Sequence, residues 1–179
     1  MKGRMEQSDE DLLKNSRWAE LYDRHQGRIY RFALHMAGSP VIADEVVQET
    51  FLDLLRGGLR FDATKGSLGA FLLGVARLKA LRLASRNGHS DQNLDAVPSQ
   101  SDLALDAETR QRNESLRAAI AGLPEHYREA LVLCELTELS YEEAATVIGC
   151  PVGTLRSRLH RARLMLLGRL VEKGIHGVH

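Results

Sequence analysis

The chain has 179 residues and a mass of 19.9 kDa, which is enough for one domain of ordinary size or two small ones. Hydrophobic residues make up 44% of it and charged residues 27%, a balance that excludes a wholly disordered chain. Aromatic residues make up only 5%, so the composition favours helices over a β-sandwich. No apolar run approaches the roughly 20 residues that cross a bilayer, and the first residues are polar. We therefore expect a cytoplasmic protein without stable membrane insertion.

The formal net charge is zero, but the charged residues are unevenly distributed along the chain. Residues 17–88 carry a net charge of +4 and residues 150–179 carry +5, whereas residues 89–113 carry −3 and residues 114–149 carry −5. Two basic blocks therefore flank an acidic middle. A basic block can bind nucleic acid or can simply form a solvated surface, so the charge pattern alone leaves both interpretations open.

Helical periodicity dominates the first half of the chain. Apolar residues recur at spacings of three, four and seven over about residues 16–37, which predicts a first helix. The pair Ser39–Pro40 then supplies an N-cap and a favoured first-turn proline, so a second helix is predicted to about residue 56. Residues 57–66 contain three glycines and are predicted to form a loop, after which Ser67 caps a third helix.

A polar, acidic stretch with Gly and Pro interrupts this pattern and predicts a linker over residues 89–106. The domains predicted on either side are residues 16–88 and 107–171, with a flexible tail over residues 1–15 and another over residues 172–179. The sequence thus predicts an all-α chain of two small helical domains joined by a flexible linker. Because the linker has few apolar residues with which to dock, we expect the two domains to be independent in solution.

The second domain has the layout of a helix-turn-helix. Helices are predicted over about residues 107–121 and 124–136. A capping box over Ser140–Glu143 begins a short helix that ends at Gly149, and Pro151 opens the last helix. A short capped helix, a turn and a basic helix in this order are typical of a DNA-binding helix-turn-helix.

The last helix is amphipathic, with an apolar stripe that includes Leu155 and Leu159 on one face and polar residues on the other. Arginine can donate two hydrogen bonds to guanine or pair with phosphate, and Ser and His can reach either. A helix that only packs on its own domain is the alternative, but the five arginines between residues 156 and 169 exceed what solubility requires. We predict duplex DNA contacts by Thr154, Arg156, Ser157, Arg158, His160 and Arg161. Among the arginines, Arg158 and Arg163 lie nearer the apolar stripe and are expected mainly to touch phosphate or acidic neighbours.

Three segments resemble the extracytoplasmic-function sigma factors, the small members of the sigma-70 family. The stretch "LPEHYREALVLCELTELSYEEAATVIGCPVGTLRSRLHRARLML" resembles region 4 of that family, and "PVIADEVVQETFLDLL" resembles its region 2.2. The stretch "RFDATKGSLGAFLLGVARLKALRLASR" is similar to regions 2.3 and 2.4. The resemblance covers roughly residues 16–88 and 107–171 in the family's order, with a linker in place of region 3. It implies a three-helix region 2 domain, a helix-turn-helix region 4 domain, and a sigma factor that directs core RNA polymerase to promoters.

The resemblance also implies roles for individual residues. A stripe on the second helix would engage the clamp helices of the polymerase β′ subunit, although an acidic stripe can also be ordinary solvated surface; it consists of Glu45, Gln48, Glu49 and Leu52. The glycine-bounded loop would meet the unpaired non-template strand of the −10 element through Arg60, Phe61 and Lys65. Nearby phosphates would be held by Lys79, Arg82 and Arg86.

Two departures from the family pattern fall in the −10 segment. Phe71 stands where the family often has Trp, and Leu78 stands where the family has an Asn whose amide could bond a base edge. The −10 preference is therefore expected to be relaxed or carried by the loop. The family also makes the polymerase β subunit, promoter DNA and an anti-sigma factor the expected partners.

Enzymatic interpretations find little support in the sequence. It contains no HExxH motif, no paired-cysteine motif, no glycine-rich phosphate loop and no nucleophile signature, so we predict no catalytic residue, no metal site and no cofactor. Cys134 and Cys150 are too few for a disulfide framework and are predicted to be reduced and structural. Two rival functions stay open: an ordinary helix-turn-helix transcriptional regulator, and a sigma-like decoy that binds a regulator or polymerase without promoter activity.

Overall fold

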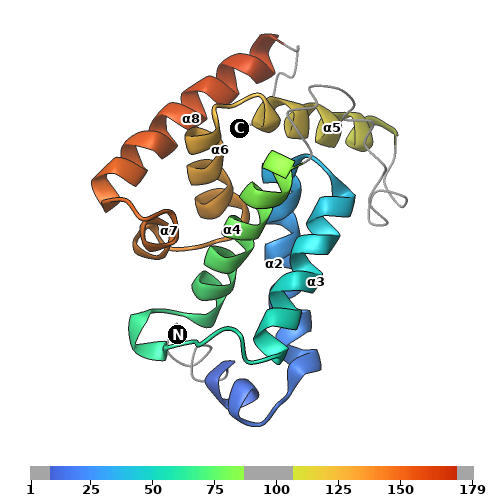
Figure 1. Cartoon of the computed structure of the whole chain (residues 1–179). Helices are drawn as coiled ribbons and strands as arrows, with labels where there is room; N and C mark the ends of the chain where they lie inside the picture. The colour runs from blue at the N-terminus through green and yellow to red at the C-terminus, as the bar shows by residue number, and fades with distance from the viewer. Residues whose placement is uncertain (1–8, 87–106, 173–179) are drawn as a thin grey trace.

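A computed structural model describes residues 9–86 and 107–172 of the chain. Every regular element within these two ranges is a helix (Figure 1). None of the helices described is both long enough and apolar enough to cross a membrane. The predicted linker over residues 89–106 lies outside the described residues, as do most of the predicted C-terminal tail and the first eight residues.

The N-terminal domain is a three-helix bundle whose helices contact one another pairwise. Its elements are α2 (Trp18–Ala37), α3 (Pro40–Leu55) and α4 (Leu68–Arg86). The second helix begins as predicted, because the Ser39 side chain accepts a hydrogen bond from the backbone N–H of Ile42. Gly38 ends the first helix in the left-handed conformation, with φ of 69°. The bundle is centred on fully buried side chains from all three helices, including Leu21, Phe32, Val46 and Leu72.

A short helix over residues 9–14 precedes this bundle, where the sequence had predicted a flexible tail. The prediction is wrong for these residues because two of their side chains are buried. Leu12 joins the hydrophobic core. Asp9 pairs with Arg24 and hydrogen-bonds His25, with 3.0 Å between Oδ2 and Nε2. Burial raises the pKa of Asp9, but hydrogen bonds and charge from these two partners outweigh it and hold the pKa below its ordinary value.

The C-terminal domain contains the helix-turn-helix. Its first helix α5 (Ala107–Ala121) and its second helix α6 (Glu125–Leu131) both pack on the last helix. The sequence predicted one helix over residues 124–136. In the structure its α-helical part ends at Leu131 and a π-helical turn follows, η3 (Val132–Leu136). That turn closes with a bond from the N–H of Thr137 to the carbonyl of Val132. The helix-turn-helix itself is formed by α7 (Tyr141–Ile148) and α8 (Val152–Glu172).

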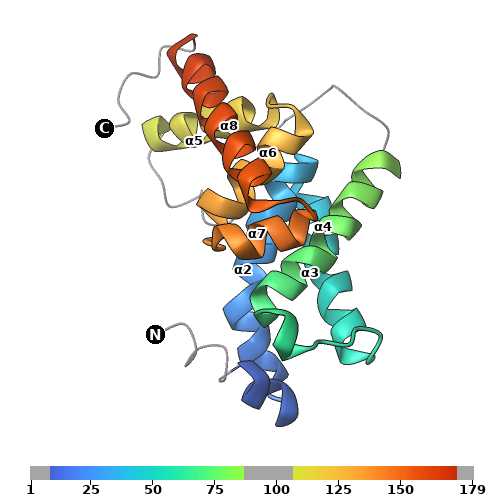
Figure 2. The ribbon, with the colours of Figure 1, turned by 90° about the vertical axis from the view of Figure 1, so that its left-hand side faces the viewer.

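The two domains pack directly against each other (Figures 1 and 2). Helix α7 contacts α4, and α2 contacts α5, α6 and η3. Arg31 donates a hydrogen bond to the carbonyl of Leu136, and Arg128 donates one to the carbonyl of Met36. The expectation of independent domains therefore differs from the structure. It was based on the linker alone, whereas the helices themselves supply the contacts.

Candidate nucleic-acid and polymerase interfaces

The polar side of α8 is accessible along its first three turns. Leu155, Leu159 and Ala162 are buried on the opposite side, as the periodicity predicts. We call the predicted DNA-contacting residues the recognition face; five of them are exposed and Arg158 is half-buried. The exposed members are Thr154, Arg156, Ser157, His160 and Arg161.

Local interactions define both ends of α7 and join it to α8. Ser140 and Glu143 form the predicted capping box, with the Ser140 side chain accepting from the Glu143 N–H and the Glu143 carboxylate accepting from the Ser140 N–H. Gly149 ends α7 with φ of 77°, a conformation that favours glycine. The guanidinium of Arg156 lies 5.6 Å from the centre of the Tyr141 ring, so a cation–π contact joins the two helices of the motif.

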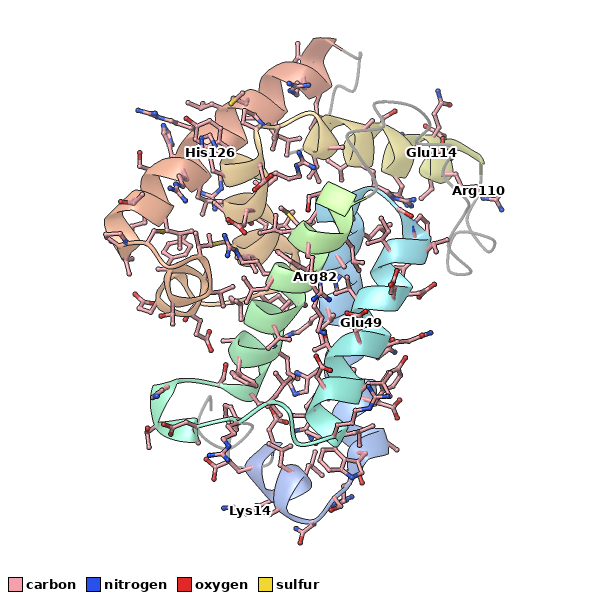
Figure 3. The ribbon with its side chains drawn as sticks, in the orientation of Figure 1. Lys14, Glu49, Arg82, Arg110, Glu114 and His126 are labelled. Atoms are coloured by element: carbon pink, nitrogen blue, oxygen red, sulfur yellow. The ribbon has the colours of Figure 1, made fainter. Side chains whose placement is uncertain are left out.

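A groove runs beside the recognition face and has a volume of about 460 Å³. Its second wall comes from the start of α6, where His126 and Tyr127 lie with ring centres 4.0 Å apart. Figure 3 shows His126 beside α8. Arg161 donates a hydrogen bond to the Tyr127 hydroxyl at 3.4 Å, which raises the pKa of this arginine. The sequence analysis missed Tyr127, because only the packing of α6 on α8 brings it to this face.

Arg163 lies at the edge of the recognition face and has an acidic partner. Its guanidinium pairs with Glu135 of η3, and this hydrogen bond raises the pKa of the arginine. The sequence predicted contacts of Arg163 with phosphate or with acidic neighbours, and Glu135 is such an acidic neighbour. The ion pair neutralises part of the charge of Arg163, so this residue is less available to DNA than Arg161, whose partner is the uncharged Tyr127 hydroxyl.

The glycine-bounded loop of the N-terminal domain is shaped by its own hydrogen bonds. Asp62 accepts from the N–H of Thr64 at 3.0 Å and from its hydroxyl at 2.6 Å, capping a single 3₁₀ turn, η1 (Ala63–Lys65). These bonds lower the pKa of Asp62. Arg60 and Lys65 are exposed, whereas Phe61 turns inward and lies with its ring centre 5.6 Å from that of Phe71.

This loop and the first half of α4 enclose what we call the loop pocket, with a volume of about 480 Å³. Its floor is apolar, with Phe61 and Phe71, and Leu78 also lines it. Its cations are Arg60 and Lys65, together with Arg77, which the sequence analysis did not select. Part of the wall comes from the other domain, through two residues of α7, Thr146 and Val147.

The predicted phosphate-binding residues of α4 have acidic partners on α3. The Nζ atom of Lys79 lies 2.6 Å from a carboxylate oxygen of Asp53, and Arg82 lies 3.1 Å from one of Glu49. Figure 3 shows Arg82 and Glu49 on these neighbouring helices. Both cations are thus partly neutralised within the domain. Arg86 is the last residue of α4, and its side chain lies outside the described part of the chain.

The predicted polymerase-facing stripe lies on the outer side of α3. Glu45, Gln48 and Leu52 are exposed, and Glu49 is half-buried beside α4. The opposite side of the helix is buried in the bundle, with Val46 and Phe51 among its core residues. The stripe is therefore available to a partner without any change in the fold.

The described residues contain no cluster of three or more His, Cys, Asp or Glu side chains that could hold a metal ion. Both cysteines are free and half-buried. Burial, together with the charge of Glu135, raises the pKa of the Cys134 thiol to about 11. A thiol of this kind is a poor nucleophile at neutral pH.

The comparisons with known proteins assign the two domains to one family. Models of sigma-70 region 2 and sigma-70 region 4 match residues 21–90 and 113–166. The ECF RNA polymerase sigma factor SigE of Mycolicibacterium smegmatis is 32% identical over 163 residues, which span 87% of this chain but only 62% of that relative. The ECF RNA polymerase sigma factor EcfG of Rhodopseudomonas palustris is 33% identical over 153 residues, spanning 80% of this chain and 79% of the relative.

Solved structures agree with this assignment. The sigma factor RpoE of Bartonella quintana, in complex with the anti-sigma factor NepR, superposes with a TM-score of 0.65 at 25% identity, covering 85% of this chain and 95% of that one. CnrH, in complex with the cytosolic domain of CnrY, has the same fold, with a TM-score of 0.66. The chain therefore belongs to the extracytoplasmic-function sigma factors of the sigma-70 family, a class that acts in transcription initiation. The resemblance noted in the sequence is confirmed.

Proposed function

We propose that this chain is a promoter-specificity subunit that brings core RNA polymerase to particular promoters and helps to open them. One observation supports this function above all others: a single helical chain carries both an exposed arginine-rich recognition face and an aromatic pocket bordered by cations. The first suits the major groove of duplex DNA, and the second suits an unstacked base and its phosphates. A sigma factor needs both surfaces.

The recognition face would bind the −35 duplex. Arg156, Ser157, His160 and Arg161 are exposed and would reach base edges, with Thr154 at the start of the helix. Arg158, half-buried in the groove, would contact phosphate. Side chains of this kind discriminate between bases in the major groove, whereas phosphate contacts fix the position of the helix.

The loop pocket would receive the unpaired non-template strand of the −10 element. Phe61 offers a stacking surface at its floor, and the exposed Arg60 and Lys65 would meet the backbone. Phosphates farther along α4 would be held by Lys79, Arg82 and Arg86. Because Leu78 replaces an amide, the base preference of this segment is expected to come from the loop.

The stripe Glu45, Gln48, Glu49 and Leu52 would bind the β′ clamp helices, and region 4 would contact the β subunit. The polymerase would perform the chemistry, in the cytoplasm where it transcribes, so we assign this chain no enzymatic activity and no cofactor. The structure of the Bartonella quintana relative contains an anti-sigma factor, which supports a similar inhibitor for this chain.

Run-off transcription with purified core polymerase tests this function. The full chain should direct transcripts from a restricted set of promoters in a genomic library, and the double variant Arg156→Ala, Arg161→Ala should lose them while keeping its affinity for core enzyme. A chain that binds promoter DNA without polymerase would be an ordinary helix-turn-helix regulator. A chain that binds polymerase and gives no transcripts would be a decoy.

A further inference from the structure

Leu78 is a large apolar side chain that α4 leaves 65% exposed. It lines the loop pocket together with Phe71 and Gly74 of the same helix. Because these residues are spaced by three and four positions, they lie on one face of α4 in successive turns. The part of the pocket that α4 forms is therefore an apolar surface that extends from Phe71 to Leu78.

Gly74 leaves a notch in this apolar surface. A Cβ atom at this position would have no heavy atom within 4 Å beyond its chain neighbours and the helix backbone. Helical side chains lean toward the N-terminus of their helix, so Leu78 leans over the turn that contains Gly74. Phe71 lies on the other side of the notch, and its ring centre is 5.6 Å from that of Phe61. The notch is thus apolar and has room for a small group such as a methyl.

Thymine is the base that carries such a group. Its C5 methyl distinguishes it from uracil and cytosine, and apolar side chains are suited to contact that methyl. A base that stacks on Phe61 would bring its ring edge toward α4, where the notch lies. The side chain of Leu78 has no polar atom with which to bond a base edge, so any base preference that it confers must come from an apolar contact.

The polar groups of the loop favour a carbonyl edge over an amine edge. Asp62 supplies a carboxylate to the pocket lining, but its Oδ1 atom already accepts from the N–H and the hydroxyl of Thr64. Its Oδ2 atom lies 3.7 Å from the Nζ atom of Lys65. The amine of cytosine would compete with these donors for Asp62, whereas the O4 carbonyl of thymine can accept from the exposed Arg60 or Lys65.

We propose that Gly74 and Leu78 form a notch for the C5 methyl group of a thymine in the unpaired −10 strand, so that this chain selects thymine through an apolar contact. This inference rests on the proposed function, since it names the base that the loop pocket receives. The loop supplies the hydrogen bonds to the base and α4 supplies the methyl contact. Because the notch is formed by a single helix, it belongs to the N-terminal domain alone.

The first test compares two short, fluorescently labelled single-stranded DNA probes that differ only in the methyl group, oligo-dT and oligo-dU. The full chain in complex with core polymerase should bind oligo-dT about fourfold more tightly, the factor that corresponds to burial of one methyl group. Leu78→Asn replaces the apolar contact with an amide and should bring the ratio of the two affinities close to one. Leu116→Asn changes an exposed leucine of α5 and should keep the parent ratio. An unchanged ratio in Leu78→Asn, or no preference in the parent complex, would overturn the proposal.

The second test fills the notch from the protein side. Gly74→Ala places a methyl group there, so it should weaken the binding of oligo-dT more than that of oligo-dU. The new Cβ meets no neighbour and alanine favours a helix, so urea unfolding should show a stability that is unchanged or raised. Gly168→Ala, in equally open surroundings on α8, is the matched control. If Gly74→Ala keeps the parent ratio of affinities, the methyl group of the base does not enter the notch.

Probes of oligo-dC and of its 5-methyl-dC counterpart separate the methyl contact from the polar edge. The 5-methyl-dC probe should bind more tightly than oligo-dC and less tightly than oligo-dT. Equal binding of 5-methyl-dC and oligo-dT would show that the notch accepts any C5-methylated pyrimidine, and the assignment to thymine would be wrong. Run-off transcription by the parent chain decides the proposed function separately. If no transcripts appear, the promoter function is removed, and the same affinity ratios measured on the chain alone still decide the notch.

Discussion

Lys79 on α4 holds Glu49 on α3, with 3.2 Å between the Nζ atom and a carboxylate oxygen. Lys79, which is proposed to bind DNA phosphate, is therefore paired with Glu49, which is proposed to bind polymerase. Arg82 approaches the same carboxylate at 3.1 Å. These ion pairs link the proposed DNA-binding and polymerase-binding surfaces. A substitution on one surface is therefore expected to change binding at the other.

Gln48→Ala and Glu49→Ala should consequently differ. Gln48 is exposed on the stripe, and its removal should weaken binding to core polymerase by roughly fivefold without changing the fold. Glu49→Ala should weaken it too, and should also raise non-specific DNA affinity because Lys79 and Arg82 lose a counter-charge. Titration against core enzyme and anisotropy with random duplex DNA measure the two effects. Asp23→Ala, an exposed carboxylate of α2, serves as control, and equal behaviour of all three variants would contradict the assignment.

Arg161→Ala should relax the preference for one or two −35 positions and cost about 1–3 kcal/mol on the preferred sequence, because a base-reading arginine is lost. Arg163→Ala should instead have a small effect on all sequences alike, since Glu135 already engages this side chain. Selection from a randomised −35 library with each variant in holoenzyme makes the comparison. If Arg161→Ala loses affinity equally for every sequence, the residue only positions the helix.

The local features of the fold could be predicted from the sequence because their partners are close along the chain. The Ser39 cap, the Ser140 capping box and the Gly149 helix end all join residues within a few positions of one another. The exposed side of α8 followed from periodicity for the same reason. By contrast, the pair formed by Arg77 and Glu129 spans 52 positions, and no local pattern indicates it.

In the candidate site, too, contacts between residues far apart along the chain could not be predicted from the sequence. Its cations were visible in the sequence, but their acidic partners depend on which helices lie side by side. Lys79 and Asp53 illustrate this, because 26 positions separate them and only the packing of α4 on α3 makes them neighbours. The polar linker was also a poor guide to domain contact, since the contacts come from the helices on either side of it.

Cys134 should react slowly with thiol reagents in the native protein. Its pKa of about 11 lies about two units above the ordinary value, so the thiolate fraction at pH 8 falls about a hundredfold. In a Cys150→Ser variant, the reaction with Ellman's reagent should be correspondingly slower in buffer than in urea. Similar rates under the two conditions would show that the thiol is not shielded by the fold.

The last prediction concerns His35, which lies at the end of α2 against the C-terminal domain. Burial, with the charges of Arg117, Arg128 and Arg31, lowers its pKa from 6.5 to about 4. The unfolded chain therefore binds more protons than the native chain between these two values, and stability falls as the pH falls through that window. The total loss of stability at pH values below this window is on the order of 3 kcal/mol. Above about pH 6.5 His35 causes no such loss.

Urea unfolding at several pH values between 7 and 4.5 measures this dependence. The His35→Gln variant should lose most of the slope, because Gln does not titrate, while His126→Gln, which changes an exposed histidine, should keep it. Asp9 acts in the same direction, but its lowered pKa places its contribution below about pH 4, outside this window. Arg31 belongs to the N-terminal domain, whereas Arg117 and Arg128 belong to the C-terminal domain. A protonated His35 repels all three arginines, so its protonation should also separate the two domains. A parent chain and a His35→Gln variant with parallel pH profiles would show that the pKa of His35 is not lowered in the native state.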